Sequence, residues 1–134
     1  MIEKINPPTI HEPSGYSHVT ISSAGRLAHL AGQCPLDLAG KVVGTPGDFA
    51  AQTDQVITNC LAALTAAGAE PSDVARSIVY VVSPDSSVLS AVWDLLNASP
   101  LAPAFTTAST LLGVASLGYT GQLIEVDLTA ALSD

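Results

Sequence analysis

One carboxylate near the end of the chain lies within an apolar segment and is the first candidate for chemistry. Between residues 122 and 130, apolar side chains alternate with Glu125, Asp127 and Thr129, which is the period of a β-strand with two different faces. A carboxylate beside an apolar face must be hydrogen-bonded or paired to remain there. Such a group can act as a general acid or base, so Glu125 is the candidate catalytic residue. The alternative is that Glu125 and Asp127 form a solvated stripe on an exposed sheet face.

Three histidines, His11, His18 and His29, are the next candidates. Their spacing matches neither a helical metal pair nor a zinc finger. Because strands are expected over 16–22 and 26–33, His18 and His29 would share one hairpin. A metal site built from them is one interpretation, and solvated or hydrogen-bonded histidines are the other.

The two cysteines, Cys34 and Cys60, are far apart and form no Cys-x-x-Cys pair. We expect two buried free thiols rather than a disulfide or a metal site. Because Cys34 precedes Pro35, a reactive thiol near the surface is the alternative. The chain also has no phosphate loop, no Gly-x-Gly-x-x-Gly, no His-Glu-x-x-His and no Gly-x-Ser-x-Gly. Nucleotide, zinc-protease and serine-hydrolase functions therefore have no motif support.

Few of the 134 residues are charged, and most of the charges are negative. The chain has 12 acidic and 4 basic residues and a formal net charge of -8, which disfavours nucleic acid and anionic membranes as partners. Only 12% of the residues are charged and 48% are hydrophobic, so we expect the surface to be completed by homo-oligomerisation. No apolar run has the length of a spanning helix, and Met1 to Lys4 lack a signal-peptide layout, so the expected location is cytoplasmic.

The pattern along the chain predicts one α+β domain over residues 1–134. Residues 1–15 carry three prolines and are expected to form an irregular arm. The remaining segments are predicted to be strands at 16–22 and 26–33 paired as a hairpin, a helix between Asp48 and Gly68, a strand at 74–82, a helix capped by Asp85, and strands at 103–112 and 122–130. The order β-β-α-β-α-β-β places both helices on one face of a mixed sheet.

The other face of that sheet has no helix to cover it. Strand alternation predicts Tyr16, His18, Leu30, Glu125 and Asp127 on this face, although the sequence does not set which parity of the second and third strands faces outward. If copies of the chain pack against it, the two carboxylates lie in or beside an interface.

Several short stretches occur in an order that is typical of one family. They are Ser14-Gly15-Tyr16-Ser17-His18, Ala31-Gly32-Gln33, Ala50-Ala51-Gln52, Ala66-Ala67-Gly68, Ser72-Asp73-Val74, Pro103-Ala104, Gly113-Val114-Ala115-Ser116-Leu117 and Leu123-Ile124-Glu125-Val126-Asp127. In these residues the chain resembles the Rid family, also called the YjgF/YER057c/UK114 family, from about Tyr16 to Leu132. The resemblance implies a chorismate-mutase-like α+β fold, a homotrimer and three ligand clefts between neighbouring subunits.

The resemblance also implies a chemistry. Active members of the family hydrolyse imines or enamines such as 2-aminoacrylate to a keto acid and ammonia, without metal or cofactor, so neither is expected here. In them, an arginine of a Pro-Ala-Arg segment binds the substrate carboxylate through its planar guanidinium, and the glutamate of the last strand positions the attacking water. Carried over to this chain, Tyr16, the backbone of Ala31 and Gly32, and Glu125 match cleft positions.

The arginine of the family has no counterpart in this chain. Counted from Pro103-Ala104 its position is Phe105, and counted back from Gly113 it is Ser109, which we prefer because that register keeps the following loop near its usual length. Losing a bidentate contact to a carboxylate costs about 2–5 kcal/mol, so the usual deaminase activity is expected to be lost. The expected ligand contacts are Tyr16, Ala31, Gly32, Phe105, Thr107 and Ser109.

Three functions are compatible with these features. The first is binding of a small, less acidic metabolite in a cleft between subunits. The second is a metal-free imine or enamine hydrolase of altered specificity, in which Glu125 positions water against a neutral or cationic imine. The third is an interaction or holdase-like module with a vestigial cleft. In all three, Arg26 and Arg76 are expected to be surface or structural charges.

Overall fold

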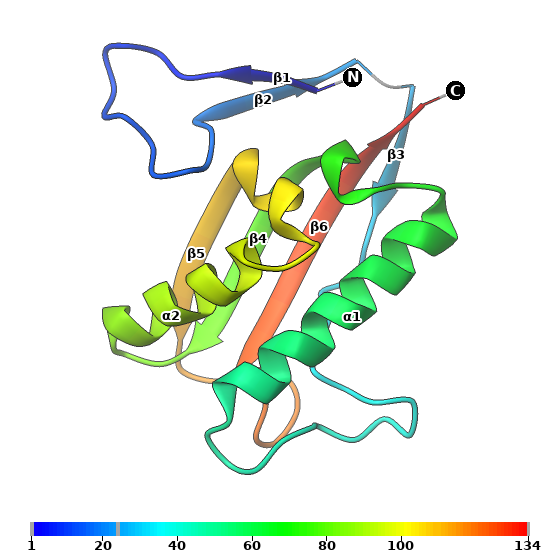
Figure 1. The fold of residues 1–134 in the computed structure, drawn as a ribbon, viewed down its shortest axis with the longest axis vertical. Coiled ribbons are helices and arrows are strands. Elements are labelled where there is room, and N and C mark those ends of the chain that lie inside the picture. The colour runs from blue at the N-terminus through cyan, green and yellow to red at the C-terminus, as the bar shows by residue number, and fades with distance from the viewer. Residues whose placement is uncertain (1, 24, 134) are drawn as a thin grey trace.

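The computed structural model describes residues 2–23 and 25–133 and has an α+β architecture (Figure 1). Its strands are β1 (Ile2–Ile5), β2 (Val19–Ser22), β3 (Arg26–His29), β4 (Val74–Val82), β5 (Ala108–Val114) and β6 (Ile124–Leu132), and its α-helices are α1 (Phe49–Ala67) and α2 (Ser86–Asn97). Four strands form a mixed sheet in the order β3-β6-β4-β5, in which only β4 and β5 are parallel. Both helices lie on one face of this sheet, as predicted.

The ends of the helices confirm the predicted caps. Asp48 accepts a hydrogen bond from the N–H of Ala51 (2.9 Å), and α1 ends at Gly68, whose φ of +79° is the left-handed conformation that glycine adopts without strain. Asp85 accepts from the N–H of Ser87 at the start of α2 (2.9 Å). In the part of the chain that the structure describes, no helix combines the length and the apolar content needed to cross a membrane.

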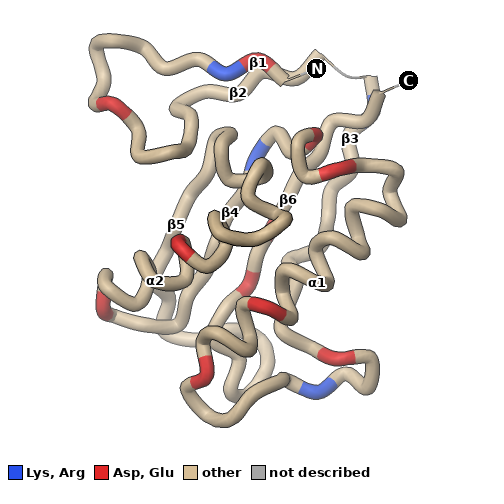
Figure 2. Tube along the Cα trace, in the orientation of Figure 1, with Lys and Arg blue, Asp and Glu red and all other residues tan. Residues whose placement is uncertain are grey.

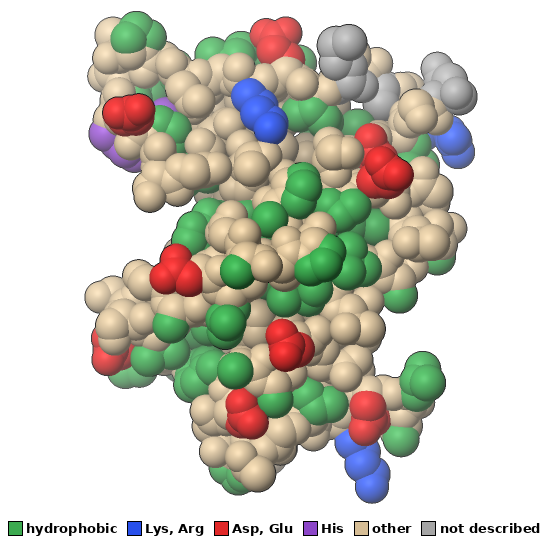
Figure 3. All heavy atoms as spheres, in the orientation of Figure 1, with side chains coloured by type: hydrophobic (Ala, Val, Ile, Leu, Met, Phe, Trp, Pro, Cys, Tyr) green, Lys and Arg blue, Asp and Glu red, His purple; other side chains and the backbone are tan. Residues whose placement is uncertain are grey.

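The hydrophobic core lies between the two helices and the sheet. Its members include Val56, Cys60 and Leu64 of α1, Val92 and Leu96 of α2, Val79 and Val81 of β4, and Val126 and Leu128 of β6. Viewed from the helix side, apolar side chains also gather at the surface between α1 and α2 (Figure 3). The helices therefore bury one face of the sheet and leave the opposite face uncovered.

The N-terminal region differs from the prediction. Residues 1–15 are not wholly irregular, because β1 pairs antiparallel with β2. The expected hairpin between the segments at 16–22 and 26–33 is wrong, since β3 pairs instead with the C-terminal half of β6. The β1–β2 pair lies across the end of the sheet near the start of β5 (Figure 1).

Long-range hydrogen bonds explain this placement. The N–H of Ser17 donates to the carbonyl of Thr107 (3.0 Å), and the N–H of Ala108 donates to the hydroxyl of Thr20 (2.6 Å). These bonds tie the β1–β2 pair to the beginning of β5, and the free edge of β6 accepts β3. Both sets of contacts join residues that are distant in sequence, so local alternation could not reveal them.

Three predicted strand boundaries also shift. The segment at 103–112 begins as a 3-10 helix (Ala102–Thr106) because Pro103 suits a helix start, and the strand follows it as β5. The last strand is Ile124–Leu132 rather than 122–130. The strand expected at 26–33 ends at His29, although Gln33 still pairs with Val126 through hydrogen bonds of 2.7 and 3.1 Å.

Burial alternates along β6 and confirms the predicted faces of Glu125 and Asp127. Ile124, Val126 and Leu128 are buried under the helices, and the two carboxylates between them lie on the uncovered face. Leu30 was expected on the uncovered face but packs against the core, because it is two residues after Ala28 and lies on the same side of the sheet. Glu125 and Asp127 therefore lie on the uncovered face, and Leu30 does not.

Candidate functional site

The carboxylate of Glu125 is held through one of its two oxygens. Oε1 accepts a hydrogen bond from Nε2 of Gln122 (3.1 Å) and another from Sγ of Cys34 (3.2 Å). Both donors are uncharged when the thiol is protonated. Oε2 lies against Gly32, where a Cβ would collide with it and would come within 2.8 Å of Cδ. Glycine at position 32 therefore leaves the space that the carboxylate occupies.

The side chain of Gln122 is fixed by hydrogen bonds at both ends. It is 3% exposed, its oxygen accepts from the N–H of Tyr119 (3.2 Å), and its nitrogen also donates to the carbonyl of Ile124 (3.0 Å). Because the oxygen already faces an N–H, the amide orientation that gives a donor to Glu125 is the one that satisfies every partner.

A second buried amide anchors the same loop to α1. Gln52 is 1% exposed, donates to the carbonyl of Gly121 (2.9 Å) and accepts from the N–H of Leu123 (2.7 Å). Hydrogen bonds of the two buried amide side chains therefore connect α1, the loop before β6 and the carboxylate of Glu125. The sequence reasoning missed Gln52 and Gln122; the available signal was a glutamine on the apolar stripe of α1 and another directly before the last strand.

Cys34 faces Glu125 as a hydrogen-bond donor. Burial, together with the hydrogen bond to Glu125 and its negative charge, raises the pKa of the Cys34 thiol to about 11, so the thiol is protonated at neutral pH. The carbonyl of Cys34 accepts from the side chain of Asn59 on α1 (2.9 Å), which fixes the backbone at this point. The structure therefore does not support the alternative of a reactive thiolate.

Both cysteines are free, as predicted, but they differ in burial. Cys60 has no exposed surface, and burial raises its pKa to about 12. Cys34 is only partly buried, in contrast to the expectation of two buried thiols.

Tyr16 and Ser109 lie together at a different place. They line a hollow of about 450 Å³ with Ser14, Trp93, Thr110 and Leu111. The hydroxyl of Ser109 accepts from Ser77 (2.6 Å), and it lies on the helix side of the sheet, opposite the face of Glu125. Within one chain, the predicted site residues therefore lie at two separate places. Ala31, Gly32 and Glu125 form one group, and Tyr16 and Ser109 form the other.

Phe105 and Thr107 are in the interior. Phe105 has no exposed surface and packs edge-on against Trp93, with ring centroids 5.6 Å apart. Thr107 is 2% exposed and donates to the carbonyl of Ala104 (2.9 Å). The 3-10 helix turns this segment inward, so the expectation that the two side chains contact a ligand has no support within the chain.

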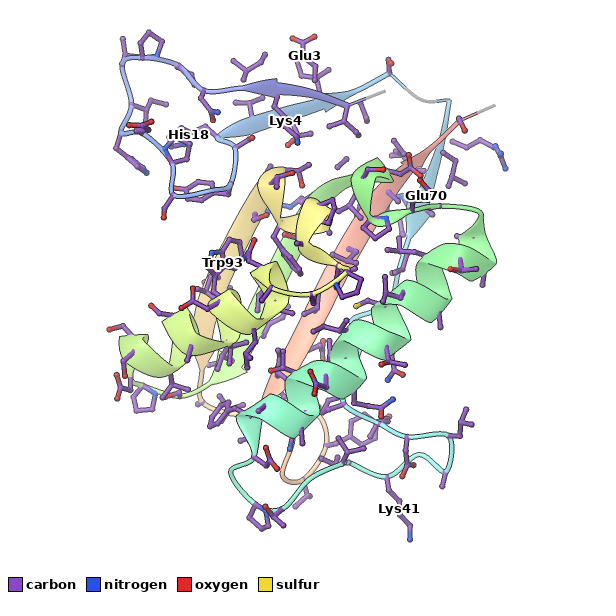
Figure 4. All side chains as sticks on the ribbon, in the orientation of Figure 1. Glu3, Lys4, His18, Lys41, Glu70 and Trp93 are labelled. Carbon is purple, nitrogen blue, oxygen red and sulfur yellow. The ribbon has the colours of Figure 1, made fainter. Side chains whose placement is uncertain are left out.

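The histidines also pair differently from the expectation. His11 and His18 are in contact, with ring centroids 4.6 Å apart, and His11 shares a hydrogen bond with the hydroxyl of Tyr16 (2.9 Å). His18 and His29 do not share a hairpin, because β2 pairs with β1. In Figure 4, His18 lies in the loop region that precedes β2, away from Trp93 on α2. The described residues contain no cluster of three or more candidate metal ligands.

The arrangement of two helices on one face of this mixed sheet is the chorismate-mutase-like α+β fold. Residues 9–132 match the family model described as Endoribonuclease L-PSP. The Rid-family protein YyfB of Yersinia pestis, whose function is unknown, is 37% identical over 98% of both chains, with a TM-score of 0.86. The chain therefore belongs to the Endoribonuclease L-PSP family, and within it to the Rid proteins.

Other relatives are more distant. RidA from an Antarctic Psychrobacter species is 24% identical over 91% of this chain and 92% of its own, with a TM-score of 0.68. Rv2704 of Mycobacterium tuberculosis, a YjgF/YER057c/UK114 family member, is 23% identical over 98% and 100%, with a TM-score of 0.63. These two show the shared fold. Among curated proteins, DfrA of Myxococcus xanthus is 36% identical over 66 residues, and the match spans about half of each protein.

The raised pKa of Cys34 predicts that its thiol reacts slowly with alkylating reagents at neutral pH. Alkylation by iodoacetamide requires the thiolate, so its rate should climb with pH to a midpoint near 11. Glu125→Gln removes the charge but not the burial, so the midpoint should move part of the way back toward 9.0. Mass spectrometry of the modified protein measures the rate, and Cys34→Ser gives the background from Cys60. A midpoint near 9 in the unaltered protein would contradict the contact.

Proposed function

We propose that this protein binds a small metabolite with a neutral or cationic nitrogen in a cleft between subunits of a homotrimer, and that it does not deaminate 2-aminoacrylate. The observation that carries the proposal is the Glu125 carboxylate, which is held by neutral donors and keeps one oxygen available. The ligand, the trimer and the loss of deaminase activity are parts of this proposal.

The open oxygen of Glu125 supports a ligand that donates hydrogen bonds. In the described part of the chain, no buried side-chain nitrogen or oxygen lacks a partner. The hydrogen bonds to Glu125 go to Oε1, so Oε2 is accessible rather than buried without a partner. An accessible carboxylate oxygen beside a glycine backbone accepts a hydrogen bond from an N–H or from water.

The location of the two groups of residues supports a cleft between subunits. Glu125 lies on the uncovered face, and the hollow that contains Tyr16 and Ser109 lies along the edge strand β5. A second copy whose β5 edge meets the uncovered face would bring its own hollow toward Glu125. Exposed apolar side chains at Leu27 and Leu112, on strands of this sheet, favour such packing.

The distribution of cations supports the absence of the usual deaminase activity. Neither Phe105 nor Ser109 supplies a guanidinium, so the carboxylate of 2-aminoacrylate would meet Glu125 without a compensating charge. The blue segments of Figure 2 are scattered over the chain rather than gathered at one surface. The same scatter, with a net charge of -8, argues against RNA as the ligand in spite of the family's descriptive name.

The proposed binding preference is testable with two ions of equal shape and opposite charge, acetamidinium and acetate. We expect acetamidinium to bind the unaltered protein more tightly than acetate, because it donates N–H groups to Oε2. NMR shift titration of backbone amides near Gly32 measures both affinities.

The matched variants are Glu125→Gln, which should remove the preference, and Asp127→Asn, which removes the same charge from the same face and should keep it. Tighter binding of acetate, or equal loss in both variants, would overturn the proposed function.

A second candidate function is hydrolysis of an imine that lacks a carboxylate. The accessible Oε2 favours it, because a general base needs a free oxygen within hydrogen-bond reach of water. Water would add to the C=N carbon while Glu125 takes one of its protons. Glu125 would return that proton to the nitrogen, and the C–N bond of the adduct would then break as the hydroxyl loses its proton, which releases ammonia and a carbonyl compound.

This hydrolase activity predicts a specific substrate pattern. Imines generated by an amine oxidase, which carry no carboxylate, should release ammonia faster with the protein than without it. Imines generated by an amino-acid oxidase should not. A coupled ammonia assay with unaltered protein, Glu125→Gln and Asp127→Asn measures the rates. Equal rates for the unaltered protein and Glu125→Gln would exclude hydrolysis and leave binding as the function.

A further inference from the structure

We propose that Gln122 and Cys34 are positioning residues that together assign different roles to the two oxygens of Glu125, with Oε1 held and Oε2 presented to the ligand. The inference rests on the proposed function, since it specifies how the same site is organised. Its geometry is nevertheless visible without a ligand.

The two donors reach Oε1 from independent parts of the chain. Gln122 lies in the loop before β6, and Cys34 lies in the segment after β3 that pairs with Val126. Gln122 is three residues from Glu125, whereas Cys34 is 91 residues away, so the two donors meet at one atom only because the segment after β3 pairs with β6. A carboxylate that accepts two hydrogen bonds at one oxygen has its rotation about the last side-chain torsion restricted.

Each donor is itself immobilised by other hydrogen bonds. Gln122 has its remaining N–H and its oxygen occupied by backbone groups, so it cannot turn away without leaving a buried polar group unpaired. The backbone of Cys34 is held by the side chain of Asn59. The carboxylate is thus supported by groups that are already in place before any ligand arrives, which is the condition for a preorganised site.

Gly32 completes the arrangement on the other side. A side chain at this position would occupy the place of Oε2, so glycine keeps that oxygen uncovered. The three residues therefore act on different atoms of one carboxylate: two hold Oε1, and one leaves room for Oε2. Oε2 is consequently the oxygen that accepts a proton or an N–H from the ligand.

The raised pKa of Cys34 agrees with this geometry. Because the thiol remains protonated at neutral pH, Cys34 is a donor under the conditions in which Glu125 would act. Besides burial, Glu125 is the cause that raises this pKa, so the alkylation rate of Cys34 reports the contact between the thiol and the carboxylate.

The first test compares acetamidinium affinities. Cys34→Ala and Gln122→Met each remove one donor and should weaken binding by about 3- to 10-fold, the size of one ordinary net hydrogen bond, because these donors orient the carboxylate and do not touch the ligand. Cys34→Ser keeps a donor and should stay within about twofold of the unaltered protein. Gln33→Met is the matched control, because Gln33 carries an amide near the site that donates to Ala31 rather than to Glu125. Its affinity should not change.

The second test needs no ligand. At pH 9, Glu125→Gln should speed alkylation of Cys34 by iodoacetamide, because it removes the negative charge that helps to raise the pKa of the thiol. Asp127→Asn removes a charge from the same face that is not among the causes of this shift, so it should leave the rate unchanged. If Gln122→Met does not fold, the comparison of Cys34→Ala with Cys34→Ser decides the inference by the affinity test.

The two tests separate the possible failures. If acetamidinium does not bind the unaltered protein, the proposed function fails, and faster alkylation in Glu125→Gln but not in Asp127→Asn still supports the contact between Cys34 and Glu125. If acetamidinium binds but Cys34→Ser is as weak as Cys34→Ala, or if Glu125→Gln and Asp127→Asn change alkylation equally, the positioning roles are overturned while the proposed function remains.

Discussion

The pair of hydrogen bonds on one oxygen of Glu125 is the interaction on which the organisation of this site depends. A carboxylate on a strand at the margin of an apolar core needs donors, and this protein supplies an amide and a thiol rather than a lysine or an arginine. The amide is in turn held by the loop before β6, and that loop is held by Gln52 of α1. The position of one functional atom is therefore linked to the packing of a helix on the opposite face of the sheet.

The use of neutral donors has a consequence for recognition. A carboxylate paired with a guanidinium is already compensated, whereas this carboxylate keeps its charge uncompensated and one oxygen accessible. Ligands with N–H groups gain from such a site, and anionic ligands are repelled by it. The sequence has 4 basic residues in 134, and the side chains that hydrogen-bond to Glu125 are neutral. The site therefore favours ligands that donate hydrogen bonds over anionic ligands.

Local rules predicted the elements whose determinants are local. Asp48, Gly68 and Asp85 mark helix ends through bonds within a few residues, and the alternation along β6 placed Glu125 on the uncovered face. The same rules failed where distant segments compete for partners. The β1–β2 pair depends on hydrogen bonds to the start of β5, which no local pattern contains.

The candidate site was predictable to a similar degree. Glu125 and Gly32 were identified from the strand pattern and the family resemblance, but the glutamine and the thiol that hold the carboxylate were not. The thiol contact joins residues 91 apart in sequence. The glutamine lies three residues from Glu125, but its orientation depends on the fold of the loop that Gln52 holds. Phe105 was expected at the ligand because of its place after Pro103-Ala104, yet the 3-10 helix turns it into the core.

The most direct test of the account is a neutron diffraction structure of the deuterated protein with acetamidinium. The account predicts that the deuterons of the Cys34 thiol and of the Gln122 amide both point at Oε1 of Glu125, and that an N–D group of acetamidinium points at Oε2 above Gly32. A carboxylate with its donors divided between the two oxygens, or with a cationic side chain on Oε2, would contradict it.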